Sequence, residues 1–267
     1  MTTPLLRIDD LHVSFRVGKQ MIHPVRGVSL ELERGETLAL VGESGCGKTT
    51  LARTILGLQA PGSGVIEYDG TDIAGLNRFA RKRYRPRIQC VFQDPFSSLN
   101  PRKRVEQLIR EPLDIHKIGD SSSRLGRAHE MMERVRLPID WGRRFPHEFS
   151  GGQRQRIGIA RALVLQPELL ICDEPVSALD VSIQAQIINL LWELKRDMGL
   201  SYLFISHDLM LVETFADRVA MMYKGEIVET GPARQVWSDP QHEFTRRMID
   251  AIPVPDVTRP TPPAFRV

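Results

Sequence analysis

Residues 42–49 constrain this chain more than any other part of its sequence. They read Gly-Glu-Ser-Gly-Cys-Gly-Lys-Thr and match the pattern G-x-x-x-x-G-K-[ST] at every fixed position. The apolar run 38–41 precedes them, and a helical pattern over 49–58 follows. This order of strand, loop and helix predicts a phosphate-binding loop in an α/β fold, because a chance glycine-rich turn would not need both flanking elements.

The loop predicts a site for ATP. Glycines let backbone amides curl around phosphate oxygens, and the following helix adds the positive end of its dipole. We expect Lys48 to reach the β- and γ-phosphates and the hydroxyl of Thr49 to bind Mg²⁺. The residues expected to hold ATP are Gly42, Glu43, Ser44, Gly45, Cys46, Gly47, Lys48, Thr49 and Thr50.

An acidic pair, Asp173 and Glu174, follows a second apolar run at 169–172. Such a pair could simply cap the next helix. Beside a phosphate loop, however, Asp173 is suited to hold the magnesium shell and Glu174 to polarise an attacking water. Because adjacent strand residues point to opposite sides, we expect the two carboxylates to do different work. Cys172 is interpreted as a small apolar strand residue.

The remaining patterns predict the α/β class. Short continuous apolar runs, such as 202–205, suit strands buried on both faces of a mostly parallel sheet. They alternate with helical patterns over 153–165 and 183–198. Residues 5–38 instead alternate between apolar and polar, which predicts antiparallel strands.

Residues 94–150 show helical but no clear strand pattern and contain several prolines, which predicts an inserted helical lobe. Beyond Ile252 the chain is proline-rich, and we expect an extended or disordered tail. The predicted division is a phosphate-loop NTPase core with an antiparallel N-terminal part over 1–93 and 154–240, a helical subdomain over 94–153, and a C-terminal extension over 241–267.

Composition argues against several other classes of protein. The chain is 42% hydrophobic and 26% charged, close to soluble globular averages, and no apolar run approaches the roughly 20 residues that span a bilayer. The first ten residues lack the pattern of a secretion signal, which predicts a cytoplasmic chain. Cys46, Cys90 and Cys172 form no C-x-x-C pair, so we expect free thiols.

Charge predicts no nucleic-acid partner, since a net charge of +3 is small for a chain of 267 residues. One segment, however, is strongly basic despite the small net charge of the whole chain. We favour a solvated surface arm over a phosphate-backbone site for it. Its members are Arg78, Arg81, Lys82, Arg83, Arg85 and Arg87.

Further motifs resemble those of the ATP-binding cassette family. Residues 149–156, Phe-Ser-Gly-Gly-Gln-Arg-Gln-Arg, are similar to the signature sequence of that family, with Phe in place of the commoner Leu. Gln93 in Phe-Gln-Asp-Pro, the loop Ser-Ala-Leu-Asp that ends at Asp180, and His207 after a predicted strand match its other landmarks. The resemblance covers about residues 5–252.

The resemblance implies that two such domains pair head to tail, so that each ATP lies between the phosphate loop of one and the signature of the other. It implies that Gln93 senses magnesium and the attacking water, that His207 contacts the γ-phosphate, and that Asp180 communicates across the dimer. Gln93 and His207, together with Glu174, would form the catalytic set. The residues that would contact the partner's nucleotide are Ser150, Gly151, Gly152 and Gln153, together with Asp180, and those that would hold Mg²⁺ are Thr49, Gln93 and Asp173.

Phe15 matches the position of the family's aromatic residue that stacks on adenine, more often Tyr. Stacking uses the face of the ring and not the hydroxyl, so the change preserves the interaction. An ordinary core position on an alternating strand is an equally good interpretation, and one strand does not separate the two.

Narrower similarities indicate the peptide and nickel importer branch. They are Ser-Leu-Asn-Pro-Arg at 98–102, the run 180–186, and His-Glu-Phe-Thr at 242–245. The branch implies a peptide or related small solute as cargo, a second and different ATPase subunit, two membrane permease subunits and an extracytoplasmic binding protein. The chain would then lie at the cytoplasmic face of the inner membrane.

Two other functions compete with this one. A non-transport cassette ATPase of translation or DNA repair would carry a second cassette, long coiled coils or zinc modules, and this chain has none of them. A regulatory module that has lost hydrolysis would not need Lys48, Asp173, Glu174 and His207 together. Nickel remains an alternative to peptides as the cargo.

Overall fold

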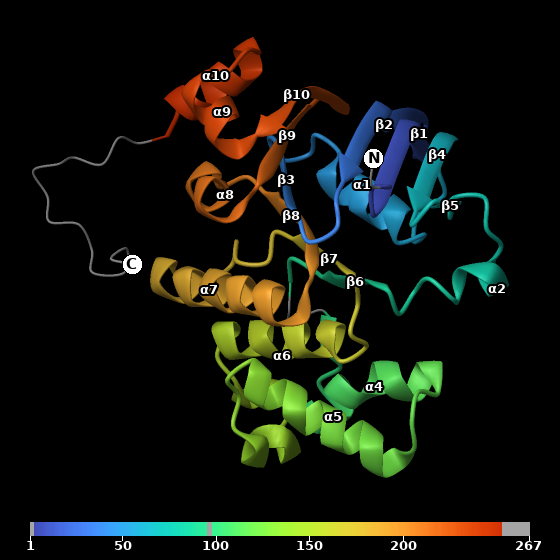
Figure 1. Ribbon diagram of the computed structural model, residues 1–267, viewed down its shortest axis with the longest axis vertical. Helices are drawn as coiled ribbons and strands as arrows, with labels where there is room; N and C mark the ends of the chain where they lie inside the picture. The colour runs from blue at the N-terminus through green and yellow to red at the C-terminus, as the bar shows by residue number, and fades with distance from the viewer. Residues whose placement is uncertain (1–2, 95–97, 253–267) are drawn as a thin grey trace, which may run out of the picture.

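The computed structural model describes residues 3–94 and 98–252, and a six-stranded sheet forms its centre (Figure 1). The strand order is β10-β9-β3-β8-β7-β6, and every neighbouring pair is parallel except β9 and β10. The strands are β3 (Thr37–Val41), β6 (Ile88–Val91), β7 (Leu169–Asp173), β8 (Ser201–Ser206), β9 (Arg218–Tyr223) and β10 (Glu226–Pro232). Every residue of β3, β7 and β8 is buried, so layers cover both faces of the sheet.

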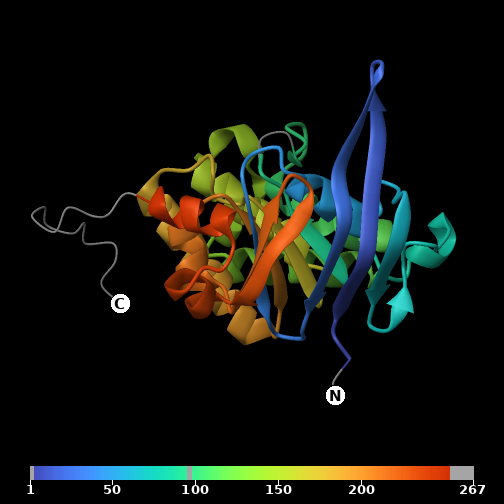
Figure 2. The same cartoon turned by 90° about the horizontal axis from the view of Figure 1, so that it is seen from above.

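A second, antiparallel sheet of four strands stands beside the first (Figure 2). Its strands, in the order β2-β1-β4-β5, are β1 (Leu6–Val17), β2 (Gln20–Leu32), β4 (Ser63–Tyr68) and β5 (Thr71–Asp72). The helix α1 (Lys48–Ile55) packs between the two sheets, because Leu51 and Ile55 share one buried cluster with Leu38 and Leu40 of β3 and with β1, β2 and β4.

The helical lobe lies below the six-stranded sheet in Figure 1. Here α6 packs against α4 and α5 as well as against β6 and α7, so one buried cluster runs from the sheet into the lobe. The helices are α2 (Arg78–Arg81), α4 (Val105–His116), α5 (Ser121–Arg134), α6 (Gly151–Leu163), α7 (Val181–Met198), α8 (Leu209–Phe215), α9 (Ala233–Ser238) and α10 (Glu243–Asp250), with 3-10 turns η1 (Ile139–Arg143) and η2 (Pro146–Glu148).

These elements confirm the predicted α/β class, with its mostly parallel core, antiparallel N-terminal part and helical lobe. Helix ends differ from the predictions. α1 stops at Ile55 because Gly57 adopts a φ of 70°, and α6 starts at Gly151, two residues earlier than expected. The predicted boundary at residue 153 thus falls within α6, and the division into domains stays a prediction. The proline-rich tail, 253–267, lies outside the described residues.

We predicted that the basic cluster at 78–87 forms one solvated surface arm. This prediction is wrong for Arg81 and Arg87. The Arg81 guanidinium is half-buried and donates to the carbonyls of Ile73 and Ala74 at 2.6 and 3.0 Å. Arg87 pairs with Asp69 at 2.7 Å and with Glu168 at 2.6 Å. Lys82, Arg83 and Arg85 are exposed, as expected of a surface arm, and the side chain of Arg78 lies outside the described part.

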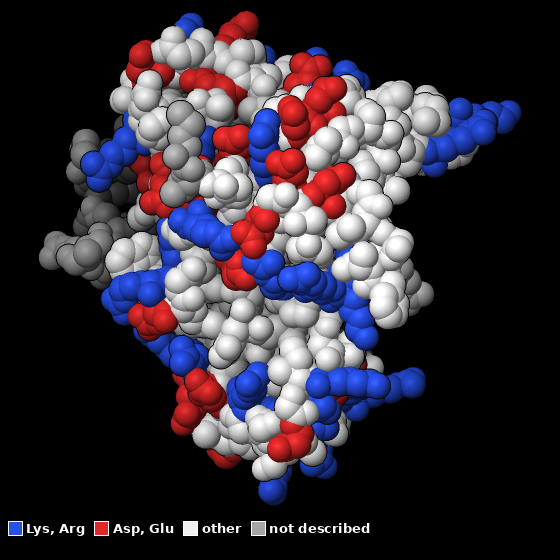
Figure 3. Space-filling model, turned by 45° about the vertical axis from the view of Figure 1, so that its right-hand side comes forward, with Lys and Arg blue, Asp and Glu red and all other residues white. Residues whose placement is uncertain are grey.

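Away from this segment, basic and acidic side chains are interspersed over the upper part of the face shown in Figure 3. Within the described ranges, none of the helices combines the length and the apolar character that crossing a bilayer requires. Burial raises the pKa of the Cys46, Cys90 and Cys172 thiols, and all three are free, as predicted.

Candidate functional site

The carboxyl ends of the parallel strands open into a cavity of about 850 Å³. Ligands bind at this edge of open parallel sheets. Its walls come from the β1–β2 hairpin, the loop after β3, and the segments that follow β6, β7 and β8. It is lined by Phe15, Ile22, Pro24, Ser44, Gly45, Gly47, Lys48, Thr49, Thr50, Gln93, Asp94, Glu174, Ser177, Ala178 and His207.

The loop between β3 and α1 needs glycine at its two ends. Gly47 caps α1 with a φ of 116°, and a Cβ added there would lie 1.9 Å from the carbonyl oxygen of Pro24. A Cβ on Gly42 would lie 2.1 Å from the carbonyl oxygen of Met222. Any larger residue would push the loop away from β2 or β9, so these glycines fix its path along the core.

Lys48 closes this loop on itself. Its side chain is buried, at 5% exposure, and its ammonium group donates to the carbonyls of Gly42 at 2.7 Å and Glu43 at 2.8 Å. The Cys46 sulfur lies 3.8 Å from the same nitrogen. A cation is therefore held inside the ring of the loop, next to the amides at the start of α1, where it would reinforce their attraction for phosphate.

Thr49 and Asp173 place two hard oxygen groups next to each other. The Thr49 hydroxyl donates to the Asp173 carboxylate at 3.2 Å, and this carboxylate is only 4% exposed. Burial raises the pKa of Asp173, and the Thr49 hydrogen bond opposes that shift. Asp173 forms no ion pair with any described Lys or Arg side chain, and such a buried carboxylate fits a hard divalent cation such as Mg²⁺, which prefers oxygen ligands.

Glu174 has a different environment from Asp173. β7 ends at Asp173, so the two residues do not alternate along a strand as predicted; instead Glu174 adopts a left-handed φ of 46°. Its amide donates to the carbonyl of Ile205 at 3.0 Å, which ties this turn to β8. The unusual backbone conformation turns Glu174 into the cavity, while Asp173 stays behind Thr49.

Gln93 and His207 hold the Glu174 carboxylate from two sides. The Gln93 amide donates to one oxygen at 2.9 Å, and Nδ1 of His207 lies 3.2 Å from the other. The Glu174 side chain is 14% exposed and that of His207 54%. Because each carboxylate oxygen can accept more than one hydrogen bond, Glu174 keeps acceptor capacity on the cavity side.

Phe15 lines the cavity and also packs against the buried cluster around α1, and its stacking on adenine stays a prediction. It pairs in register with Ile22 of β2, which lines the cavity as well and is 40% exposed. Ile22 and Pro24 were not predicted. The short Gly-Lys turn after Val17 could have identified Ile22 as the residue opposite Phe15.

Nine predicted residues do not line this cavity. Four of them belong to the phosphate loop or the end of β7: Gly42, Glu43, Cys46 and Asp173. The other five come from the start of α6 and the cap of α7: Ser150, Gly151, Gly152, Gln153 and Asp180. The exposed Ser150 caps α6, and its side chain accepts from the amide of Gln153. The exposed Asp180 caps α7, and hydrogen bonds from Ser182 and the amide of Ile183 lower its pKa. A Cβ on Gly151 would touch Leu179, so the two caps are neighbours on the surface.

Comparison with known proteins identifies the family. The model of the ABC transporter family matches residues 25–177, more than half of the chain. The oligopeptide transport ATP-binding protein OppF of Bacillus subtilis is 47% identical over 260 residues, which cover 96% of this chain and 85% of that protein.

Two solved structures resemble the chain in fold. The first is a dimeric, post-hydrolysis state of the ATP-binding cassette MJ0796 bound to ADP and Pi, with a TM-score of 0.78, 27% identity and coverage of 86% of this chain and 99% of that one. The second is cbiO1 from Clostridium perfringens, part of the ABC transporter complex cbiONQ, with a TM-score of 0.79, 27% identity and coverage of 94% and 97%. By the family match and these identities, the chain belongs to the ABC transporter family, as one of its ATP-hydrolysing subunits.

Proposed function

We propose that this chain drives the import of peptides through a membrane transporter, using ATP bound in the cavity at the strand ends. The observation that carries the proposal is the Glu174 carboxylate held between Gln93 and His207 beside the phosphate loop. The cargo is inferred from relatives such as OppF, which is named for oligopeptide transport.

Residues of the phosphate loop would bind and orient the triphosphate. Lys48 and the amides at the start of α1 offset the charge of the β- and γ-phosphates. Thr49 and Asp173 would hold Mg²⁺, and Gln93, which lines the same cavity as Thr49, would complete the magnesium site. When bound, Mg²⁺ neutralises charge that develops on the phosphate oxygens.

Glu174 is the proposed general base. It would accept a proton from the water that attacks the γ-phosphate, while the Gln93 amide holds the carboxylate in place. His207 lies on the other side of Glu174 and is more than half exposed, so it can reach the γ-phosphate as well. The products would be ADP and phosphate.

The predicted residues at the start of α6 and the cap of α7 would act on a second ATPase subunit. Ser150 and Gly151 stand at the amino end of α6, where amides without helical partners favour a phosphate group. Gly152, Gln153 and Asp180 would belong to the same surface. The dimeric MJ0796 structure supports a paired arrangement, and we propose that here the pair consists of two different ATPases.

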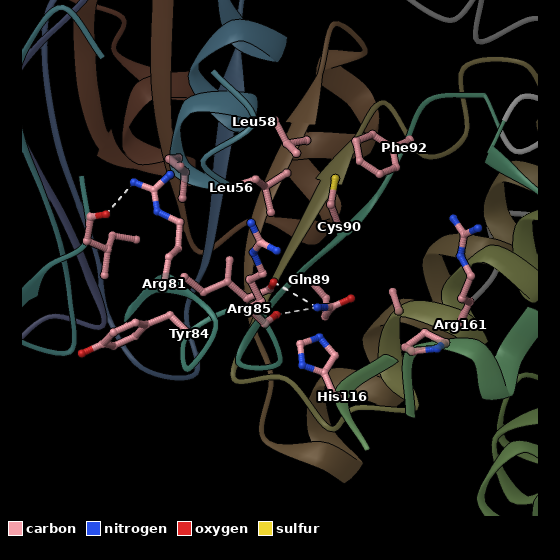
Figure 4. Close-up of a pocket in the computed structure, with 15 residues that line it drawn as sticks. Leu56, Leu58, Arg81, Tyr84, Arg85, Gln89, Cys90, Phe92, His116 and Arg161 are labelled. Atoms are coloured by element: carbon pink, nitrogen blue, oxygen red, sulfur yellow. Dashed lines mark hydrogen bonds between the residues drawn. The ribbon is translucent and has the colours of Figure 1, made fainter. Parts of the chain in front are cut away.

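A second cavity, of about 370 Å³, lies between the core and the helical lobe (Figure 4). Leu56, Leu58 and Arg85 lie on one side of it, and His116 and Arg161 lie on the other. Cys90 and Phe92 also line it, and Phe92 directly precedes Gln93. We call this cavity the lobe groove, and propose that the two permease subunits contact it.

The lobe groove would couple transport to hydrolysis. A partner that moves the lobe relative to the core also moves the end of β6, and with it the Gln93 amide that positions Glu174. This arrangement would place the chain at the cytoplasmic face of the membrane, with the solute-binding protein on the opposite side.

The direct test is ATP turnover by the transporter reconstituted with its permeases and binding protein. Peptides should stimulate turnover and enter the vesicles, and Glu174→Gln in this chain should remove most of the stimulated rate. Stimulation by Ni²⁺ and not by peptides would contradict the proposed cargo. Peptide uptake that proceeds without ATP would contradict the proposed function as a whole.

A further inference from the structure

The segment 79–85, before β6, carries side chains that the ATP site does not use. Phe79 is 86% exposed, more than any other large apolar side chain in the described part of the chain. Lys82, Arg83 and Arg85 are exposed too, and none of them has an acidic partner among the described side chains. An apolar ring and three cations are thus presented together to the outside.

Hydrogen bonds and ion pairs hold this segment against the core. Asn77 caps α2 by accepting from the amides of Phe79 and Ala80 at 3.0 and 2.9 Å. The Arg81 guanidinium lies so close to Gly57 that an added Cβ would be 1.8 Å from it, and Arg87 is paired with Asp69 and Glu168. Arg81 and Arg87 therefore anchor the segment at the core, whereas the exposed Lys82 and Arg83 do not line the lobe groove.

The segment also borders the lobe groove. Arg81, Tyr84 and Arg85 line the groove, and Figure 1 shows α2 standing away from the body of the molecule. None of the described residues that line the groove is acidic. Leu58 in its wall is 65% exposed, and Ile115, next to His116 on α4, is 63% exposed. This face combines exposed apolar side chains with positive charge.

We propose that Phe79, Lys82, Arg83 and Arg85 bind the anionic lipid headgroups that surround the permease subunits. The proposal rests on the proposed function, because the adjoining lobe groove is the assigned contact with those subunits. Headgroups attract Lys and Arg through a diffuse negative potential, and aromatic rings partition into the interface between headgroups and acyl chains.

A lipid surface fits these side chains better than a protein does. The cations are long and exposed and have no ion pair among the described side chains, and Phe79 is 86% exposed. A fitted protein interface buries its apolar anchors and pairs its charges, whereas headgroups need only proximity. An acidic protein partner is the competing outcome of the test below.

The experiment measures flotation of the purified chain with vesicles at low salt. One set contains phosphatidylglycerol and phosphatidylcholine, and the other phosphatidylcholine alone. The unaltered chain should float with the anionic set only, and added salt should release it. Each basic side chain near an anionic surface strengthens binding about fivefold, so K82Q/R83Q/R85Q should weaken it on the order of a hundredfold.

Matched variants distinguish vesicle binding by this segment from attraction by the overall charge of the chain. Phe79→Ser should weaken vesicle binding about tenfold without a change in charge. R127Q/R143Q/R234Q removes three exposed basic residues from α5, η1 and α9, and should leave binding within about twofold of the unaltered chain. ATP binding by every variant should stay unchanged, which shows that each one is folded.

Three results would overturn the proposal. In the first, the unaltered chain does not bind anionic vesicles. In the second, the matched control R127Q/R143Q/R234Q weakens vesicle binding as much as K82Q/R83Q/R85Q does. In the third, vesicle binding is lost in R16Q/K19Q, at the tip of the β1–β2 hairpin, and not in K82Q/R83Q/R85Q. If the triple variant keeps vesicle binding but no longer co-purifies with the permeases, the segment contacts protein. Peptide-stimulated ATP turnover is measured separately, so a negative vesicle result with intact turnover overturns only the lipid contact.

Discussion

Among single residues, Asp173 combines deep burial with its proposed role as a ligand of Mg²⁺. Its carboxylate is buried with one hydroxyl donor, and burial raises its pKa. A neutral amide would keep the Thr49 hydrogen bond without the cost of a buried charge. The proposed ligand of Mg²⁺ is therefore a carboxylate whose burial the fold alone does not favour.

Asp173→Asn should raise the melting temperature of the nucleotide-free chain by about 2–4 °C at pH 7 and weaken Mg²⁺-dependent ATP binding. The folded chain binds the Asp173 proton more tightly than the unfolded chain does. Stability therefore falls as pH rises from the ordinary carboxyl pKa, about 4, through the raised folded value, and the advantage of Asn should vanish toward pH 4.

Thermal melting across pH checks this prediction, with the exposed Asp239→Asn as the control that should change little. A lower melting temperature for Asp173→Asn at pH 7 would show that the carboxylate stabilises the fold.

Phe15 carries a second prediction for a single residue. Loss of a stacking contact worth about 1 kcal/mol should raise the dissociation constant for ATP about fivefold in Phe15→Ala, and Phe15→Tyr should have little effect. Val17→Ala on the same strand is the control, since Val17 is 54% exposed and does not line the cavity. If Phe15→Ala lowers the melting temperature equally with and without nucleotide, Phe15 is only a core residue.

Among the elements, α6 links the signature residues to the rest of the lobe. Its first turn lies against the start of α7, because a Cβ added to Gly152 would come within 2.5 Å of Cγ2 of Ile183. The Ile side chain is branched at Cβ and has few rotamers in a helix. Even a small side chain at position 152 must therefore displace the exposed cap at Ser150 or the start of α7.

Gly152→Ala should destabilise the chain by about 1–3 kcal/mol through overpacking and reduce ATP turnover in the assembled pair. Gly158→Ala in the same helix is a close control, because an added Cβ there meets no atom within 4 Å. That change should stabilise the chain by about 0.5–1 kcal/mol through helix propensity. Denaturant unfolding and ATP turnover are measured for both variants. Equal effects of the two changes would contradict the contact between position 152 and α7.

At the scale of the whole molecule, the sequence predicted the α/β class and several residues that line the cavity at the strand ends, since both depend on local patterns. An apolar run precedes the loop Gly42–Thr49 and a helical pattern follows it, and Asp173 and Glu174 directly follow the apolar run 169–172. Contacts between distant segments were not predictable from such patterns. The left-handed turn at Glu174 depends on its bond to β8, and the burial of Arg81 depends on how α2 meets Gly57.

The pairing of two ATPases is testable in a mixed complex with changes in this chain only. Lys48→Ala should disable the nucleotide site built on this chain's phosphate loop, and Ser150→Arg should disable the site built on the partner's. Nucleotide photolabelling on each chain distinguishes the two sites. If Ser150→Arg disables the site of its own Lys48 and spares that of the partner, the head-to-tail arrangement is wrong.

The central claim is that Glu174, held by Gln93 and His207, activates the attacking water. The most direct measurement is single-turnover hydrolysis of bound ATP by the assembled complex carrying Glu174→Gln in this chain. The amide nearly matches the carboxylate in shape but does not accept the proton. ATP should bind with unchanged affinity, and cleavage at this site should slow by about 10²–10⁴-fold. Cleavage at the unaltered rate would contradict the assignment of Glu174 as the base.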